Sequence, residues 1–218
     1  MSSHHIVRDD QEPALIIANG ASCSMEFLNQ LLEWQPLVIV LDSAMERVAE
    51  LGIKVDVLLG DFDRGFDPLV YTEKQFPLTI VHTPNQDKTD LEKAFDYLIE
   101  RGHRGVNVVW ATGNRMDHTL HNLTIMARYQ NDLKVVYLDD HSKLFLAPKK
   151  FEKWYLKDSI LSLIPLGTVT GITTKNLAYP LTDETLTLGY RSGSSNHVAE
   201  NGLVTIAFET GDLLLIES

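Results

Sequence analysis

The arrangement of apolar residues limits the possible folds of this chain more than any other feature. From Ala14 to about Asp139, short apolar runs alternate with longer segments in which apolar residues recur at helical spacing. Such alternation is typical of repeated β-strand and α-helix units. The predicted strands are Ala14–Ala18, Leu37–Leu41, Val55–Leu59, Leu78–Val81, Val106–Trp110 and Leu133–Leu138.

The segments between these runs predict the helices and, with the strands, a fold class. Gly52 and Gly102 follow two of the segments, as is common after a helix C-terminus. Because the strands are almost continuously apolar, we expect a parallel sheet covered on both faces. We therefore predict an α/β fold, a Rossmann-like, doubly wound domain that binds ligands at the carboxyl ends of its strands. The predicted helices are Met25–Trp34, Ala44–Leu51, Asp90–Arg101 and His118–Tyr129.

A different pattern begins after about Ala147, where short strand-like runs are separated by glycines and no helix-length segment remains. This pattern predicts a small antiparallel β-sandwich or barrel, and divides the chain into residues 1–147 and 148–218. A unit this small is expected to share its apolar burial with the first domain or with another subunit. The predicted strands are Tyr155–Ile164, Val169–Thr174, Thr185–Leu188, Leu203–Phe208 and Leu213–Ile216.

The composition excludes several classes of function. A net charge of −11 disfavours binding to nucleic acid. No apolar run approaches the roughly 18 residues that a membrane span requires, and Met1–Pro13 lacks the apolar core of a signal peptide. The single cysteine, Cys23, cannot form an internal disulfide. The expected location is therefore the cytoplasm.

An acidic loop follows the predicted strand Val55–Leu59, with the sequence Gly60-Asp61-Phe62-Asp63-Arg64. In an extended segment, Asp61 and Asp63 point to the same side while Phe62 points into the core. Two carboxylates at the end of a strand suit Mg²⁺, which prefers a few carboxylates together with waters and substrate phosphates. The alternative is a solvated turn that uses Asp and Gly for their turn geometry.

A second polar segment, residues 85–92, follows the predicted strand Leu78–Val81 and opens a helix. Thr89 and Glu92 have the spacing of a capping box, and Asp90 is favoured by the helix dipole, so these three residues have a purely structural explanation. That explanation does not cover the neighbouring amide, carboxylate and ammonium, which lie just outside a helix N-terminus where phosphate is readily held. These neighbours are Gln86, Asp87 and Lys88.

A third loop, residues 113–118, again joins a predicted strand to a predicted helix. Arg115 can bind a phosphate bidentately, Asp117 can receive a ribose hydroxyl or cap the helix, and His118 can donate to a phosphate. The first strand-to-helix turn, Asn19-Gly20-Ala21-Ser22, lacks the G-x-G-x-x-G pattern, and no P-loop occurs. Dinucleotide oxidoreductases and P-loop ATPases are therefore disfavoured.

These loops, in this order, resemble the thiamin pyrophosphokinase family. The family's G-D-F-D-S, D/N-Q-D-K-T-D and G-x-R-x-D-H-x-x-x-N segments are matched by residues 60–64, 85–90 and 113–122. In the second half, residues 176–181, 184–186 and 193–196 resemble the family's L-x-Y-P-L, E-T-L and G-T-S-N run. After Leu37–Leu41 the family has D-G-G-A-N, whereas this chain has Asp42-Ser43-Ala44-Met45-Glu46, so only the aspartate is kept.

The resemblance implies an α/β domain that binds ATP and Mg²⁺, then a β-sandwich that binds thiamin and forms a homodimer with active sites at its interface. It implies that Asp61, Asp63 and Asp90 bind Mg²⁺. It also implies that Gln86 holds thiamin together with Ser194, Ser195 and Asn196. The remaining loop residues are assigned to the nucleotide: Asp42, Thr89, Arg115, Asp117, His118 and Asn122.

The expected reaction is attack of the thiamin hydroxyl on the β-phosphorus of ATP, with AMP as the leaving group. Positioning and charge neutralisation dominate such transfers, so Lys88 and Arg115 are expected to stabilise developing charge. Asp63 and Asp87 are both candidates for the group that accepts the hydroxyl proton. Two alternatives are a diphosphokinase for another hydroxymethyl acceptor such as a pterin, and a non-catalytic sensor of a nucleotide or thiamin diphosphate.

Overall fold

The structure is a computed structural model that describes residues 14–63 and 65–218. The chain forms two compact units, of which the first ends at Asp140 and the second comprises His141–Ser218. The elements of the first unit are β1 (Ala14–Ile17), α1 (Met25–Leu32), β2 (Leu37–Leu41), the 3₁₀ helix η1 (Asp42–Ala44), α2 (Met45–Glu50), β3 (Val57–Gly60), the 3₁₀ helix η2 (Pro68–Tyr71), β4 (Thr79–His82), α3 (Asp90–Glu100), β5 (Gly105–Val109), α4 (Met116–Tyr129) and β6 (Lys134–Leu138).

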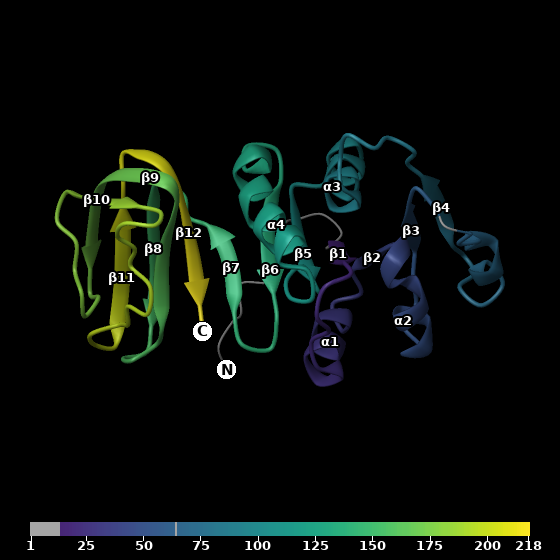
Figure 1. Cartoon of the computed structure of the whole chain (residues 1–218). Helices are drawn as coiled ribbons and strands as arrows, with labels where there is room; N and C mark the ends of the chain where they lie inside the picture. The colour runs from purple at the N-terminus through teal and green to yellow at the C-terminus, as the bar shows by residue number, and fades with distance from the viewer. Residues whose placement is uncertain (1–13, 64) are drawn as a thin grey trace. The chain divides into compact units, whose positions relative to one another are not determined.

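The first unit is built on a parallel sheet with the strand order β4-β3-β2-β1-β5-β6 (Figure 1). Ile16 of β1 lies in register with Ile39 of β2 on one side and with Val108 of β5 on the other. Every residue of β1, β3 and β5 is buried. Since alternate residues of a strand face opposite sides of a sheet, both faces are covered, which confirms the predicted α/β class.

The strand order reverses beside β1, which pairs with β2 on one side and with the much later β5 on the other. At such a reversal the loops at the carboxyl ends of the two strands diverge, and a crevice opens between them. Here the loop after β1 lies along the loop after β5, because the Gly20 N–H donates to the Trp110 carbonyl at 2.6 Å and the Ala21 N–H donates to the Thr112 carbonyl at 2.7 Å.

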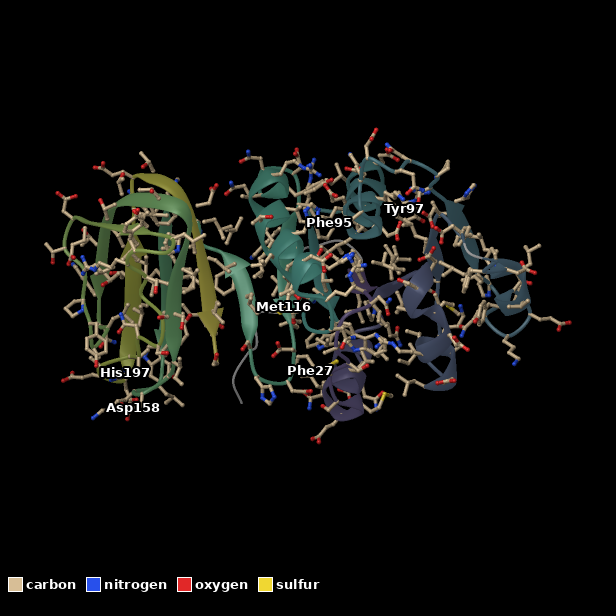
Figure 2. All side chains as sticks on the ribbon, viewed as in Figure 1. Phe27, Phe95, Tyr97, Met116, Asp158 and His197 are labelled. Atoms are coloured by element: carbon tan, nitrogen blue, oxygen red, sulfur yellow. The ribbon has the colours of Figure 1, made fainter. Side chains whose placement is uncertain are left out.

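The helices begin where local side chains satisfy their first N–H groups. Ser24 caps α1 by accepting from the N–H of Phe27. The predicted capping box at α3 is present, because the Thr89 hydroxyl accepts from the Glu92 N–H while the Glu92 carboxylate accepts from the Thr89 N–H at 2.8 Å. α4 begins at Met116, two residues earlier than predicted, without a side-chain cap (Figure 2).

The second unit is antiparallel, as predicted. Its strands follow the order β7-β12-β9-β11-β8. In addition, β10 pairs with β9 between Thr168 and Ile172. More exposed side chains alternate with less exposed ones along β8 and β11, as expected of strands with one face on a core. The elements are β7 (Lys143–Leu146), β8 (Lys150–Tyr155), β9 (Leu161–Lys175), β10 (Glu184–Thr187), β11 (Gly202–Ala207) and β12 (Thr210–Glu217).

Two strand predictions in this unit are wrong. The expected strand Val169–Thr174 lies within β9 but is not a separate strand, and of the expected strand Tyr155–Ile164 only the last four residues belong to β9. Gly167 and Gly171, with φ of 89° and 67°, let this strand turn through conformations that other residues rarely adopt, so it bends without ending. The strands β7 and β8 were not predicted; β8 contains two lysines and a glutamate, which are poor indicators of a strand.

The boundary between the units also differs from the expected position at residues 147 and 148. β7 pairs with β12, and the second unit begins at His141. The strand β7 thus belongs to the antiparallel second unit.

Within residues 14–63 and 65–218 we find no helix that combines the length and the apolar character needed to cross a membrane.

A cluster of ionisable side chains is enclosed in the second unit. The Lys153 ammonium donates to both carboxylate oxygens of Glu217 at 2.8 and 2.9 Å, and the Tyr155 hydroxyl also donates to this carboxylate. Lys143 lies 3.8 Å from the same group. Burial alone would raise the pKa of Glu217, but the hydrogen bonds from Lys153 and Tyr155 lower it below its ordinary value.

This cluster generates a prediction about pH and stability. Because the folded pKa of Glu217 lies below the unfolded value of about 4.5, the cluster stabilises the fold above that pH and loses its effect as the pH falls through the folded pKa. We expect Glu217→Gln to lower the free energy of unfolding by about 2–4 kcal/mol at pH 7, and the difference from the wild type to shrink below pH ~4.5. Urea unfolding between pH 3 and pH 7 measures this, with the exposed Glu209→Gln as the matched control. An undiminished difference at pH ~3 contradicts the account.

Candidate active site

A cavity of about 710 Å³ lies at the carboxyl ends of the parallel strands of the first unit. Its walls come from the loops after β1, β2, β3, β4 and β5, together with the first turns of α3 and α4. The fold thus brings together three loops that were singled out from the sequence. The predicted site residues that line the cavity are Asp42, Asp61, Asp63, Gln86, Lys88, Thr89, Asp90, Arg115, His118 and Asn122.

Asp42 is held at the floor of the cavity by backbone donors. It is 9% exposed and accepts from the N–H of Phe62 at 3.1 Å and from the N–H of Ser43 at 2.5 Å. Burial raises the pKa of Asp42, and the nearby charge of Asp90 raises it further. β3 can approach this closely only because residue 60 is glycine, since a Cβ there would lie 2.3 Å from the Asp42 carboxylate.

The loop after β3 does not have the extended conformation that was predicted. Phe62 has φ of 54°, in the left-handed region, and its ring stacks on His82 and Phe66 instead of entering the core. The prediction for Phe62 was therefore wrong, because its N–H is captured by a carboxylate from the preceding strand end. Asp61 and Asp63 nevertheless both line the cavity.

Gln86 links the loop after β4 to Asp61. Its amide donates to the Asp61 carboxylate at 2.9 Å, and this hydrogen bond lowers the pKa of Asp61. This hydrogen bond therefore joins the segment 85–92, which follows β4, to the loop 61–63, which follows the neighbouring strand β3.

Lys93 is a residue of this site that the sequence analysis missed. It is 7% exposed, it lines the cavity, and its ammonium lies 3.0 Å from an Asp90 carboxylate oxygen. A buried lysine must be paired to offset its desolvation. The available signal was its position three residues after Asp90, one helical turn along α3.

Lys88 and Thr89 enter the cavity just ahead of α3. Lys88 donates to Asp96 at 2.5 Å, and this carboxylate raises the pKa of Lys88. Thr89 is fixed by its bond to Glu92. Burial alone would raise the pKa of Glu92, but hydrogen bonds from Thr89 and from neighbours on α4 lower it to about 2.

The third loop contributes a cation to the site, and the helix α4 that follows it contributes a buried amide. Arg115 pairs with Asp117 at the surface, so Asp117 does not line the cavity and does not cap α4. The side chain of His118 is exposed at the cavity. Asn122 is buried and donates to the Ala111 carbonyl at 2.7 Å.

The remaining predicted residues lie elsewhere. Asp87 is exposed and does not line the cavity. Ser194, Ser195 and Asn196 belong to the second unit, where Asn196 is only 3% exposed. The side chain of Asn196 bonds the backbone of Tyr179 twice, accepting from its N–H at 3.1 Å and donating to its carbonyl at 2.9 Å.

The described residues contain no ready-made metal site. Among the residues that the structure describes, no three His, Cys, Asp or Glu side chains are grouped so that they could hold one ion. The binding of Mg²⁺ by Asp61, Asp63 and Asp90 therefore stays a prediction.

Comparison with known proteins identifies the family. A family model described as thiamin pyrophosphokinase, catalytic domain, matches residues 28–137, and one described as thiamin pyrophosphokinase, vitamin B1 binding domain, matches residues 149–213. The chain belongs to the thiamin pyrophosphokinase family.

Individual members of the thiamin pyrophosphokinase family agree with this assignment. The chain is 27% identical to thiamine pyrophosphokinase of Bacillus subtilis over 209 residues, which cover 93% of this chain and 97% of that protein. It is 30% identical to thiamine pyrophosphokinase 2 of Arabidopsis thaliana over 74% of this chain, and it spans 64% of the length of that plant relative. The crystal structure of thiamin pyrophosphokinase from Geobacillus thermodenitrificans superposes with a TM-score of 0.78 at 26% identity and covers 94% of this chain and 96% of that one.

The segment 42–46 departs from the thiamin pyrophosphokinase pattern but retains its aspartate, Asp42, which is buried. Asp42 occupies the cavity floor, Met45 is buried, and Glu46 is exposed. Ser43, which stands where the family pattern has glycine, lines the cavity beside Asp42.

The contact between Gly60 and Asp42 yields a prediction. Because an added Cβ would overlap the Asp42 side chain, we expect Gly60→Ala to lower the free energy of unfolding by about 1–3 kcal/mol. In an Asp42→Gly background, where the overlapping atoms are gone, Gly60→Ala should lower the free energy of unfolding by clearly less. Urea unfolding of both single variants and the double variant measures the difference, and equal costs in the two backgrounds would contradict the proposed overlap.

Proposed function

We propose that this chain transfers a diphosphate group from ATP to the hydroxyl of thiamin, releasing AMP and thiamin diphosphate. The observation that carries the proposal is the gathering of carboxylates, lysines and an arginine from separate strand ends around one cavity, in a chain of the thiamin pyrophosphokinase family. Such a mixture suits a polyphosphate and its counter-ion better than it suits an apolar ligand.

The donor chemistry of the cavity fits Mg²⁺. Its carboxylates offer hard oxygen atoms, and they lie close enough together that the charge of Asp90 adds to the effect of burial in raising the pKa of Asp42. Mg²⁺ commonly uses one or two carboxylates with waters and substrate phosphates, so it does not require a protein cage of three ligands. Asp61, Asp63 and Asp90 are the residues proposed to hold it, and when bound it would neutralise charge on the phosphate oxygens.

The reaction requires little covalent chemistry of the protein. The thiamin oxygen forms a bond to the β-phosphorus, the bond from that phosphorus to the bridging oxygen breaks, and AMP leaves with this oxygen. Lys88 and Arg115, both at the cavity, are proposed to stabilise the developing negative charge on the phosphates. Lys93 would keep Asp90 oriented through its 3.0 Å contact.

The thiamin hydroxyl must also lose a proton. Of the two candidate acceptors, Asp63 lines the cavity and Asp87 does not. This placement favours Asp63 as the group that receives the proton.

Thiamin recognition is proposed to use Gln86 together with the loop that contains Ser194, Ser195 and Asn196. Because the Asn196 amide is already bonded to the Tyr179 backbone, its contribution would be to hold this loop in shape. The two serines are exposed and remain the candidates for direct contact.

A homodimer with active sites at its interface is part of the proposal. It is supported by the exposed apolar side chains of Trp154 and Leu203, which are cross-strand neighbours in the second unit and are 57% and 47% exposed. The proposed location is the cytoplasm, because the single Cys23 suits a reducing compartment.

The decisive experiment measures AMP and thiamin diphosphate formed from ATP and Mg²⁺, with and without thiamin and with EDTA as a control. We expect AMP that depends on thiamin and disappears with EDTA. Preference for a pterin would move the proposal to another acceptor, and thiamin binding without AMP formation would favour a sensor.

Single carboxylate variants test the assignment of the site. We expect Asp61→Asn and Asp90→Asn each to lower turnover by about 10²-fold while the fold stays intact, because charges aimed at the reacting phosphates contribute strongly to catalysis. Circular dichroism and steady-state rates measure the two effects, and Asp132→Asn, at an exposed position of the same unit, is the matched control. Near-normal turnover in both variants would remove these aspartates from the mechanism.

A further inference from the structure

Lys88 is held at the cavity by a carboxylate that is not itself part of the cavity. The Lys88 ammonium donates to Asp96 at 2.5 Å, and Asp96 lies one and a half turns into α3 without lining the cavity. The two side chains are 40% and 33% exposed. Because ion pairs with this much exposure contribute little to stability, the main effect of the contact is on where the ammonium lies.

The Asp96 carboxylate is itself fixed by a second helix. Its other oxygen accepts from the hydroxyl of Tyr129, at the end of α4, at 3.1 Å. Tyr129 is 6% exposed, and its ring packs edge-on against Phe95, one residue before Asp96. The buried ring therefore fixes the position of the hydroxyl, and the hydroxyl restrains the carboxylate oxygen that accepts from it.

The Tyr129 hydroxyl is also bonded within a wider network. Arg128 donates to it at 3.1 Å and pairs with Glu92, the same residue that closes the capping box with Thr89. The contacts thus run from Lys88 to α4 and return to the first turn of α3. The two residues that precede α3, Lys88 and Thr89, are therefore both bonded to the same network of side chains.

Prior placement matters for a lysine more than for most side chains. A lysine has a long flexible stem, and immobilising it when a ligand binds costs conformational entropy. A side chain held in place before binding avoids part of this cost. Since an ammonium has three hydrogens, Lys88 can keep its bond to Asp96 and still donate to a phosphate.

We propose that Asp96, fixed by Tyr129, is a positioning residue that presents the Lys88 ammonium to the phosphates of ATP and so sets nucleotide affinity. The inference rests on the proposed function. Asp96 acts through Lys88 and does not touch the substrates, so its removal should weaken nucleotide binding without changing the affinity for thiamin.

A double-mutant cycle tests this coupling. The binding of a non-hydrolysable ATP analogue with Mg²⁺ is measured by calorimetry for the wild type, Asp96→Asn, Lys88→Met and the double variant, and steady-state kinetics give KM for ATP and for thiamin. We expect Asp96→Asn to raise Kd for the analogue and KM for ATP by about tenfold, with KM for thiamin changed by less than about twofold. In the Lys88→Met background, Asp96→Asn should raise Kd for the analogue and KM for ATP by no more than about a further twofold.

The controls separate positioning from a general effect on the helix. Glu100→Gln makes the same chemical change at an exposed position of α3 and should leave both affinities unaltered. Tyr129→Phe removes only the hydroxyl and should give a smaller loss in the same direction, and it replaces Asp96→Asn as the test if the latter fails to fold.

Several results would overturn the inference. Unchanged or tighter nucleotide binding in Asp96→Asn would show that the carboxylate does not position Lys88 for phosphate. An equal loss in the Lys88→Met background would show that Asp96 acts independently of Lys88. If the wild type binds the analogue but forms no AMP with thiamin, the proposed function fails while the coupling between Asp96 and Lys88 is still measured.

Discussion

The parallel pairing of β1 with β2 on one side and with β5 on the other is the interaction on which the rest of the first unit depends. It directs the carboxyl ends of all these strands to one edge of the sheet, where their loops must share a small space. Loops that are far apart in the sequence thereby become neighbours. The resulting bonds cross from strand to strand, as when Asp42 accepts from the N–H of Phe62 or Gln86 donates to Asp61.

This convergence creates an electrostatic difficulty, since aspartates from three strand ends approach one another. Two lysines reduce this repulsion by pairing with carboxylates near the cavity. Lys93 pairs with Asp90, and Lys88 pairs with Asp96. These pairs keep positive charge beside the cavity in fixed places. A polyanionic ligand with a counter-ion would therefore meet charges of both signs that are already arranged, and less reorganisation would be needed on binding.

The sequence predicted much of this arrangement because the relevant signals are local. Continuous apolar runs indicate buried parallel strands, and the spacing of Thr89 and Glu92 predicted a capping box that the structure confirms. The predictions failed where a distant partner decides the outcome. Phe62 takes a left-handed conformation because a carboxylate twenty residues earlier captures its N–H. Likewise, the spacing of Lys93 three residues after Asp90 indicates a pair on α3, but it does not show that α3 would bury this pair beside the cavity.

The Asn196 side chain has a consequence for how the second unit can recognise a small molecule. Its amide joins the loop at residues 193–197 to the backbone of Tyr179, and the N–H of Ser195 donates to Ser162 at 2.9 Å, so the loop is tied down at two points by the protein itself. The shape of this loop is therefore established when the chain folds, before any ligand arrives. In the proposed role of this loop in thiamin binding, a surface held in this way would select its ligand by shape. Its selectivity would change not only with the serines proposed to contact the ligand but also with a residue that holds the loop, even if that residue never meets the ligand.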